Sequence, residues 1–134
     1  MANSPPEGYP RLSPYLNYRD TGAMIAWLSK AFGLVERERM QAPDGSVQHA
    51  EMTFEDAVIM MGTPSKDYKN PNMLGQTTQS LYMYVDDVDE HSKTARTAGA
   101  EIIEEPSTQD YGDRRYGAKD PEGHVWYFAS RVND

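Results

Sequence analysis

The chain has 134 residues, a formal net charge of −8 at pH 7 and no cysteine. The excess of 21 Asp and Glu over 13 Lys and Arg argues against a nucleic-acid-binding protein, which needs a basic face to displace the counterions of its ligand. The lack of cysteine excludes disulfides, thiolate metal ligands and a cysteine nucleophile. No apolar run is long enough for a membrane span and residues 1–10 lack the layout of a secretory signal, so we expect a cytoplasmic protein without membrane contact.

The first half of the chain predicts one helix among four strands. Residues 1–11 are rich in proline and glycine and are expected to form a flexible arm. A strand is expected over 12–18, followed by a helix that begins at Asp20 or Thr21 and ends at Gly33, because apolar residues recur there at three- and four-residue steps. The remaining strands of this half are expected at 34–40, 47–54 and 57–61.

The second half predicts the same order after an irregular connector over 64–79. A strand at 80–85, a helix at 88–98 and a strand at 100–104 come first. A loop from Pro106 to Tyr111 leads to strands at 113–119 and 124–129. Between these last two strands, Asp120-Pro121-Glu122-Gly123 predicts a tight structural turn, because Pro fixes φ at its second position and Gly accepts a positive φ.

Matching features of the two halves are separated by a nearly constant offset. Asp20 and Asp87 are 67 positions apart, Gly33 and Gly99 are 66 apart, and the apolar runs that begin at Val58 and Val125 are again 67 apart. This spacing indicates a duplicated βαβββ unit. We therefore expect an α+β fold in a single domain over 12–134, with module one at 12–63 and module two at 80–130.

The tail of the chain carries its most specific motif. Tyr111-Gly112-Asp113-Arg114 is followed, after five residues, by Asp120-Pro121-Glu122-Gly123-His124-Val125-Trp126. Together with the two modules and His49-Ala50-Glu51, this pattern resembles the glyoxalase and bleomycin-resistance superfamily, also called vicinal oxygen chelate proteins, over residues 12–130. The tail is similar to that of a small homodimeric branch. The resemblance implies a cupped mixed sheet of eight strands, half from each module, with a cavity completed by dimerisation and, in enzymatic members, a divalent metal.

The superfamily's metal positions can be placed on this sequence. Metal-binding members have one ligand at the start of the first strand of each module and a carboxylate in its last strand. Here these positions fall on Ser13 and Met60 in module one and on Ser80 and Tyr127 in module two, and a shift by one residue brings no His, Asp or Glu to them. Such side chains do not make a site for a divalent catalytic metal. We expect no metal and no other cofactor.

Strand alternation predicts the lining of the cup, since every second side chain of a strand shares a face. Tyrosine and methionine offer apolar surface with a polar handle or a flexible fit, which suits an aromatic or cationic molecule that is held without reaction. The alternative is that the same side chains fill a solid core. Arg114 either binds a carboxylate or phosphate or makes a structural pair with Asp113 or with a partner chain. The predicted ligand-binding residues are Tyr15, Asn17, Met60, Tyr82, Tyr84, Arg114 and Tyr127.

The three histidines have different predicted roles. His49 and Glu51 lie two apart on a predicted strand and so share one face. They are the candidate acid–base pair, because imidazole titrates near neutrality, or else belong to a half-exposed polar strand face. His91 is expected on the surface of the second helix, and His124 is expected to be structural.

Three classes of function remain open from the sequence. The leading hypothesis is a metal-independent, homodimeric protein that sequesters an aromatic or cationic compound; the acidic surface either attracts such ligands or serves solubility alone. The alternative is a glyoxalase-like lyase or isomerase that acts on a small carbonyl compound through His49 and Glu51. The third is a scaffold or regulatory dimer with a filled interior.

Overall fold

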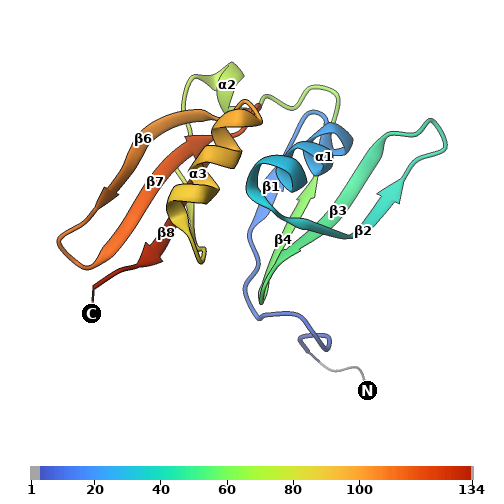
Figure 1. Ribbon diagram of the computed structural model, residues 1–134. Helices are drawn as coiled ribbons and strands as arrows, with labels where there is room; N and C mark the ends of the chain where they lie inside the picture. Colours follow the sequence, from blue (N-terminus) through green and yellow to red (C-terminus); the bar gives the residue numbers. More distant parts are fainter. Residues whose placement is uncertain (1–3, 134) are drawn as a thin grey trace. The chain divides into compact units, whose positions relative to one another are not determined.

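The computed structural model describes residues 4–133, which form two compact units (Figure 1). The first unit extends to Ser29 and includes Gly33–Tyr68; the second consists of Lys30–Phe32 and the residues from Lys69 onward. Each unit contains a four-stranded mixed sheet, and the order of elements along the chain repeats the βαβββ pattern. The fold is therefore α+β with two βαβββ modules, as the sequence predicts.

The sheet of the first unit has the strand order β1-β4-β3-β2. β1 is parallel to β4, and the other neighbours are antiparallel. β1 begins after Pro14, later than the sequence predicts, although the Pro14 carbonyl still accepts a hydrogen bond from the Met60 amide at 3.0 Å. The elements are β1 Tyr15–Asn17, α1 Thr21–Phe32, β2 Val35–Gln41, β3 Val47–Phe54 and β4 Ala57–Gly62.

The sheet of the second unit has the matching order β5-β8-β7-β6, with β5 parallel to β8. β6 continues past Pro106, so the predicted loop at Pro106–Tyr111 is wrong in its first part. Proline is tolerated there because β6 is an edge strand and its register shifts between Glu104 and Ser107. The elements are α2 Pro71–Leu74, β5 Ser80–Tyr84, α3 Val88–Thr97, β6 Glu101–Thr108, β7 Asp113–Lys119 and β8 Val125–Arg131.

Strand register confirms the duplication. Tyr15 pairs with Met60 across β1 and β4, and Tyr82 pairs with Tyr127 across β5 and β8, so both partners are displaced by 67 positions. The helices are built alike: Asp20 accepts a hydrogen bond from Ala23 N at the start of α1, and Asp87 accepts one from Glu90 N at the start of α3. Each aspartate thus satisfies an amide that a helix start leaves unpaired.

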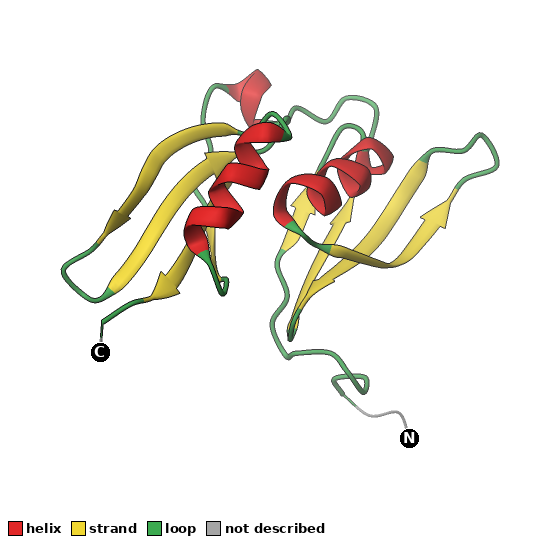
Figure 2. Cartoon of the chain, in the orientation of Figure 1, coloured by secondary structure: helices red, strands yellow, loops and turns green. Residues whose placement is uncertain are grey.

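Each sheet has a covered face and an open face. Figure 2 shows one long helix over one face of each sheet. Covered side chains such as Leu16, Met61, Trp126 and Phe128 are buried, whereas their neighbours Tyr15 and Tyr82 on the other face are half exposed. This alternation leaves an open face on each sheet, and the predicted site residues are distributed over both open faces, apart from Arg114.

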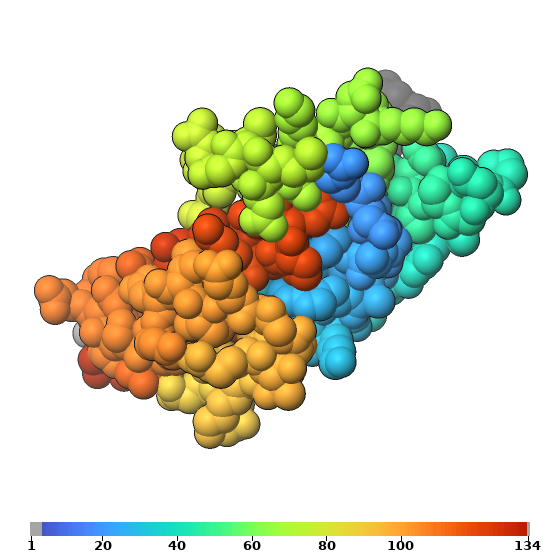
Figure 3. Space-filling model, turned by 90° about the horizontal axis from the view of Figure 1, so that it is seen from above, coloured from blue at the N-terminus to red at the C-terminus, as the bar shows by residue number. Residues whose placement is uncertain are grey.

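The connector is shaped by the turn at 120–123. Asn70 accepts a hydrogen bond from Met73 N to begin α2, which the sequence does not predict, and donates to the Glu122 carboxylate at 2.9 Å. Asn72 donates to the Pro121 carbonyl at 2.8 Å. In the space-filling view the yellow-green connector accordingly lies beside the orange-red segment that contains this turn (Figure 3). In residues 4–133 no helix is long and apolar enough to cross a membrane.

Candidate functional site

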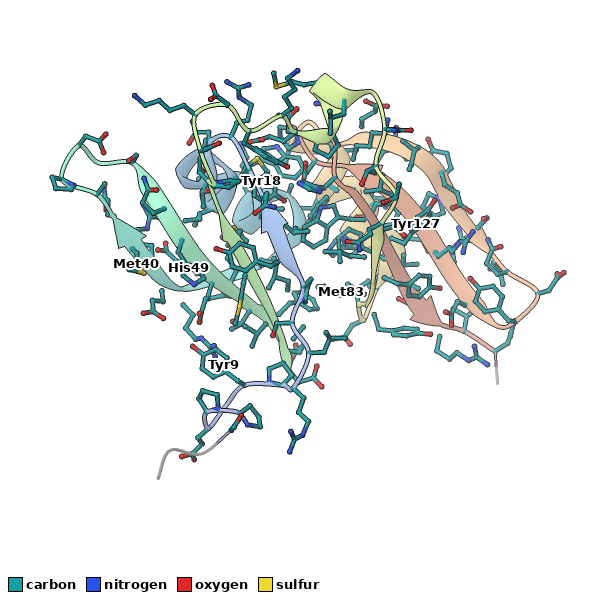
Figure 4. The ribbon with its side chains drawn as sticks, turned by 180° about the vertical axis from the view of Figure 1, so that it is seen from behind. Tyr9, Tyr18, Met40, His49, Met83 and Tyr127 are labelled. Atoms are coloured by element: carbon teal, nitrogen blue, oxygen red, sulfur yellow. The ribbon has the colours of Figure 1, made fainter. Side chains whose placement is uncertain are left out.

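The open face of the first sheet carries a hydrogen-bonded network of side chains from β1, β3 and β2 and from the N-terminal segment. The Tyr15 hydroxyl of β1 lies 2.9 Å from His49 Nδ1 on β3, and His49 Nε2 lies 3.2 Å from Glu51 Oε2. Tyr9 and Arg37 bind the other oxygen of Glu51 at 2.6 and 3.1 Å. We call Tyr9, Tyr15, Arg37, His49 and Glu51 the His49 cluster; Tyr9 and His49 are labelled in Figure 4.

Glu51 is the buried, charged end of this cluster. Burial raises the pKa of its carboxyl, but the hydrogen bonds from Tyr9, His49 and Arg37 outweigh that effect and hold the pKa below its usual value. An ionised carboxylate only accepts hydrogen bonds, so the contact between His49 Nε2 and Glu51 is a donation from the imidazole. In neutral imidazole Nδ1 is then the acceptor, and the Tyr15 hydroxyl donates to it.

The N-terminal segment contributes to the cluster through Tyr9. The Tyr9 ring lies under the Arg37 guanidinium, whose Cζ atom is 4.1 Å from the ring centroid, and the hydroxyl reaches the buried Glu51. A cation over a ring and a charge-assisted hydrogen bond both tie this part of the segment to the sheet. The arm predicted over 1–11 is therefore fastened at Tyr9, while residues 1–3 lie outside the described residues.

The open face of the second sheet carries four tyrosines. Tyr82 and Tyr84 both donate to Asp113 Oδ2, at 2.6 and 2.8 Å, and the Tyr111 hydroxyl lies 3.3 Å from that of Tyr82. The Tyr82 ring stacks on that of Tyr127 with centroids 6.5 Å apart. We call Tyr82, Tyr84, Tyr111 and Tyr127 the tyrosine face.

Asp113 holds the tyrosine face together from below. It is almost fully buried, and its second carboxylate oxygen lies 3.2 Å from Arg131 Nη1. The pKa of Asp113 lies below its usual value. The largest cause is the hydrogen bond from Tyr82; the bonds from Tyr84 and Arg131 add to it, and together they outweigh burial, which raises the pKa. In return, burial and the bond to Asp113 raise the pKa of Tyr82, and the bond to Asp113 raises the pKa of Tyr84. Both phenols are neutral and both donate inward.

Arg115 and Gly117 complete this face beside Tyr127. Arg115 Nη1 donates to the Tyr111 hydroxyl at 3.0 Å, its Nε binds Glu104, and its Cζ lies 5.2 Å from the Tyr127 centroid. A Cβ atom on Gly117 would meet the Tyr127 ring at 2.8 Å, so the glycine gives that ring its place on the sheet.

The structure brings together most, but not all, of the predicted ligand-binding residues. Within their units, Tyr15 and Met60 pair across β1 and β4, and Tyr82 and Tyr127 pair across β5 and β8. The Asn17 carbonyl on the first open face accepts a hydrogen bond from the Tyr68 hydroxyl. Arg114 lies on the helix side of β7, where it forms an ion pair with Asp89 of α3 at 3.1 Å. Its partner within the chain is Asp89 and not Asp113 as the sequence suggested, because Asp113 lies on the opposite face of β7 and binds Arg131 there.

His91 does not lie free on the helix surface as predicted. Its Nδ1 lies 2.5 Å from the hydroxyl of the fully buried Tyr116, and its Nε2 lies 2.9 Å from the Phe32 carbonyl, all within the second unit. Burial lowers the pKa of His91, opposed by the bond to Phe32. His124 follows Gly123, and its amide binds Asp120 Oδ1 at 3.1 Å as part of the turn.

The residues at the superfamily's metal positions do not fit a divalent metal. Ser13 and Met60 in the first unit, and Ser80 and Tyr127 in the second, offer hydroxyl and thioether groups in place of imidazole and carboxylate. Over residues 4–133 no group of three or more His, Asp or Glu side chains is arranged to hold a metal ion.

Sequence reasoning missed several residues of the His49 cluster and several that support the tyrosine face. Strand alternation, counted from Tyr127 and its partner Gly117, would have placed Asp113 and Arg115 on the open face and Arg114 on the other. Tyr9 had no signal, because it lies in a proline-rich segment without periodicity. Arg37 lies where the β2 register shifts, between Glu36 and Glu38, so a regular count would have misplaced it.

A separate polar hollow of about 520 Å³ lies on the first unit. None of the predicted site residues lines it. Its lining residues are Arg19, Asp44, Ser46, Gln48, Thr63, Pro64, Ser65 and Lys66.

Comparisons with known proteins agree with the fold. An uncharacterized protein of Mycobacterium bovis is 32% identical over 130 residues, which cover 93% of this chain and 86% of that protein. The crystal structure of TioX from Micromonospora sp. ML1 is 29% identical with a TM-score of 0.75 and covers 90% of this chain and 98% of that one.

A glyoxalase/bleomycin resistance protein/dioxygenase family enzyme from Burkholderia phytofirmans PsJN is 23% identical with a TM-score of 0.67, covers 88% of this chain and 97% of that one, and shows the fold alone. Residues 11–128 match the Glyoxalase/Bleomycin resistance protein/Dioxygenase superfamily. With 118 of its 134 residues matched and both βαβββ modules in place, this chain belongs to that superfamily.

Proposed function

We propose that this protein binds and sequesters an aromatic or cationic small molecule on the tyrosine face, without a metal. The observation that carries the proposal is the sharing of one buried carboxylate by two tyrosine hydroxyls, Tyr82 and Tyr84 on Asp113. This arrangement turns the phenolic protons inward. It leaves ring surface and phenol oxygens as the groups available to a ligand.

The exposed rings suit ligands of this class. Tyr82, Tyr84 and Tyr111 are 42%, 57% and 51% exposed, so their rings are open to a ligand. A ring face attracts cations through its quadrupole and stacks with planar aromatic groups. The net charge of −8 favours a cationic ligand further.

The tyrosine face has groups for binding and few for chemistry. Asp113 is held ionised, and Tyr82 and Tyr84 are held neutral, so these three groups do not exchange protons near neutral pH. A general acid or base works best with a pKa near the working pH. This favours sequestration over catalysis at the tyrosine face.

A ligand screen tests the proposal directly. Planar natural products and DNA-damaging antibiotics, cationic and neutral, are screened by thermal shift and calorimetry on the intact chain. We expect a planar cation to raise the unfolding temperature, because a ligand that binds only the folded state stabilises it. Silence across a broad panel would contradict the proposal.

Two variants of one residue show whether ring faces do the binding. Tyr84→Phe keeps the ring and removes the hydroxyl, whereas Tyr84→Leu removes the ring. We expect Tyr84→Phe to keep the affinity for the ligand found in the screen and Tyr84→Leu to weaken it by roughly 1 kcal/mol, about fivefold, which is the contribution of an exposed cation–π contact. Equal effects of both changes would assign binding to the hydroxyl and not to the ring.

The His49 cluster supports a second candidate, a glyoxalase-like lyase or isomerase acting on a small carbonyl compound. Glu51 orients the imidazole of His49, as an acid–base histidine requires. His49→Ala should abolish turnover of such a substrate while the protein remains folded by circular dichroism. An unchanged rate would eliminate the role.

We also infer that the protein is a cytoplasmic homodimer of the small branch that the tail motif suggests. Exposed apolar side chains on the sheets, among them Val35, Met40 and Ile103, support an interface with a second copy.

A further inference from the structure

The Tyr15 hydroxyl is hydrogen-bonded to a base in a way that no other tyrosine of the two open faces is. It lies 2.9 Å from Nδ1 of His49, whose other nitrogen lies 3.2 Å from the buried carboxylate of Glu51. A nucleophile, a base within hydrogen-bond distance and a third group that orients the base are the three parts of an activated nucleophile. Of these three side chains Tyr15 is the one open to a substrate, since half of its surface is accessible while Glu51 is buried.

Gly62 makes this contact possible. A Cβ atom at Gly62 would meet the Tyr15 hydroxyl at 2.5 Å, which is closer than real Cβ atoms approach. Gly62 is the strand partner of His49 on one side and of Asn17 on the other, so the Tyr15 side chain crosses β4 at the one residue that leaves room for it. The backbone at this point accommodates the hydroxyl that His49 binds.

The second unit provides an internal comparison. Tyr82 corresponds to Tyr15 in the duplicated register, but Ala129 occupies the position of Gly62, and its partner on β7 is Arg115, where the first unit has His49. The hydroxyl of Tyr82 donates to Asp113 instead, and its pKa is raised by burial and by that bond. Two tyrosines at equivalent positions therefore face a base in one unit and a carboxylate in the other.

We propose that Tyr15 is a nucleophile activated by His49, with Glu51 as the positioning residue, and that its substrates are acyl donors with a good leaving group, such as activated esters. This activation does not depend on ligand binding at the tyrosine face. In this proposal Tyr15 forms a covalent bond to the substrate, which differs from acid–base action of His49 on a carbonyl compound.

The acyl transfer is a substitution at the acyl carbon, in which Tyr15 replaces the leaving group. Tyr15 Oη attacks the acyl carbon and forms the new C–O bond, while its proton passes to His49 Nδ1 and the resulting imidazolium is stabilised by Glu51. The bond to the leaving group breaks, the leaving group departs with the electron pair, and His49 returns the proton to it or to solvent. The products are acyl-Tyr15 and the free leaving group.

The test uses 4-nitrophenyl acetate as the acyl donor and the intact protein. After short exposures and an acid quench, acetyl groups on individual tyrosines are quantified by peptide mass spectrometry. Tyr15, Tyr82 and Tyr84 are 50%, 42% and 57% exposed, so the two tyrosines of the second unit are controls of matched accessibility in the same sample. General-base assistance accelerates a reaction by about 10²–10⁴-fold. We therefore expect the acetylation rate of Tyr15 to exceed the rates of Tyr82 and Tyr84 at least about tenfold.

Two variants separate activation from exposure. His49→Gln keeps a polar side chain but removes the base. Gly62→Ala keeps the imidazole but displaces the Tyr15 hydroxyl, and its Cβ also meets the backbone carbonyl of Gln48 at 2.6 Å, beside His49 on β3. Both should lower the acetylation rate of Tyr15 at least about tenfold, while the rates at Tyr82 and Tyr84 remain at their wild-type values and report that the fold is intact. If Gly62→Ala fails to fold, His49→Gln alone decides.

Two outcomes would overturn the inference. One is acetylation of Tyr15 no faster than that of Tyr82 and Tyr84 in the wild-type protein. The other is a Tyr15 rate that His49→Gln leaves unchanged, which would show that the hydrogen bond to His49 is structural only.

Discussion

Asp120 satisfies three donors with one side chain, which explains why the turn before β8 carries an aspartate and a tryptophan six residues apart. Its Oδ1 accepts from the amides of Glu122 and His124, at 3.0 and 3.1 Å, and its Oδ2 accepts from Trp126 Nε1 at 3.0 Å. Asp120 and Trp126 are both buried, so these donors have no water to replace the carboxylate.

Replacing this carboxylate should be costly. We expect Asp120→Ala to lower the free energy of unfolding by about 3 kcal/mol, because it leaves buried donors unsatisfied. Urea unfolding followed by Trp fluorescence measures the change. Asp44→Ala is the matched control: Asp44 also binds a backbone amide and a side chain, those of Ser46, but in an exposed turn, and should cost less than about 1 kcal/mol. Equal losses would contradict the assignment.

His91 should make stability depend on pH in the mildly acidic range. Neutral His91 donates from Nε2 to Phe32 and accepts at Nδ1 from Tyr116, whose hydroxyl is fully buried; protonation would remove that acceptor. Burial lowers the pKa of His91 below its ordinary 6.5, so the folded state binds fewer protons than the unfolded state. The stabilisation is complete above pH 6.5 and decreases as the pH falls below it, by at most about 1.4 kcal/mol per pH unit.

The measurement is a comparison of wild type with His91→Gln, which cannot titrate. The difference between their free energies of unfolding should narrow as the pH is lowered from 7.5 to 5. A constant difference would show that His91 does not change its protonation on unfolding.

At the scale of elements, the two long helices begin with equivalent aspartate caps. Asp20 and Asp87 each bind the amide three residues further along, at 3.0 and 3.1 Å. We expect Asp20→Ala and Asp87→Ala each to lower the free energy of unfolding by about 1 kcal/mol, because each change exposes a helix amide without a partner. Thermal or urea unfolding measures both. Asp86→Ala, an exposed neighbour, should change stability by less than about 0.5 kcal/mol.

Most elements could be predicted from the sequence because their signals are local. Caps, helical spacing and turn residues place α1, α3 and the hairpin turns within a few residues of their positions. The errors fall where tertiary context overrides the local signal. Pro106 reads as a strand end, yet an edge position lets β6 continue to Thr108. α2 has only four residues, and its start depends on Asn70, which is tied to the distant Glu122.

At the scale of the whole molecule, the residues at the four metal positions predict that chelators do not change the stability of the protein. Ser13, Met60, Ser80 and Tyr127 stand where superfamily members that bind a metal have their ligands. We therefore expect EDTA to leave the unfolding temperature unchanged and elemental analysis of protein purified without chelators to find no stoichiometric divalent metal. A stoichiometric metal that chelation removes with loss of stability would contradict this expectation.

The second expectation for the whole molecule is association. Apolar side chains that stay exposed in a single copy, among them Val35, Met40 and Ile103, favour burial against a partner. Sedimentation equilibrium at micromolar concentration should give twice the mass of one chain. A single-chain mass at every concentration would exclude the homodimer.

The sequence by itself determined the duplicated βαβββ architecture, the superfamily and the unsuitability of the four metal positions, because repeat spacing, turn chemistry and donor type are all properties of the chain read in order. Only the tertiary structure decided which side chains meet. Tyr15 reaches His49 because Gly62 leaves room on an intervening strand, and Tyr82 and Tyr84 share Asp113 because β5, β8 and β7 are neighbours. Such contacts join residues 29 to 34 positions apart, and local sequence patterns, which extend over fewer residues, do not predict them.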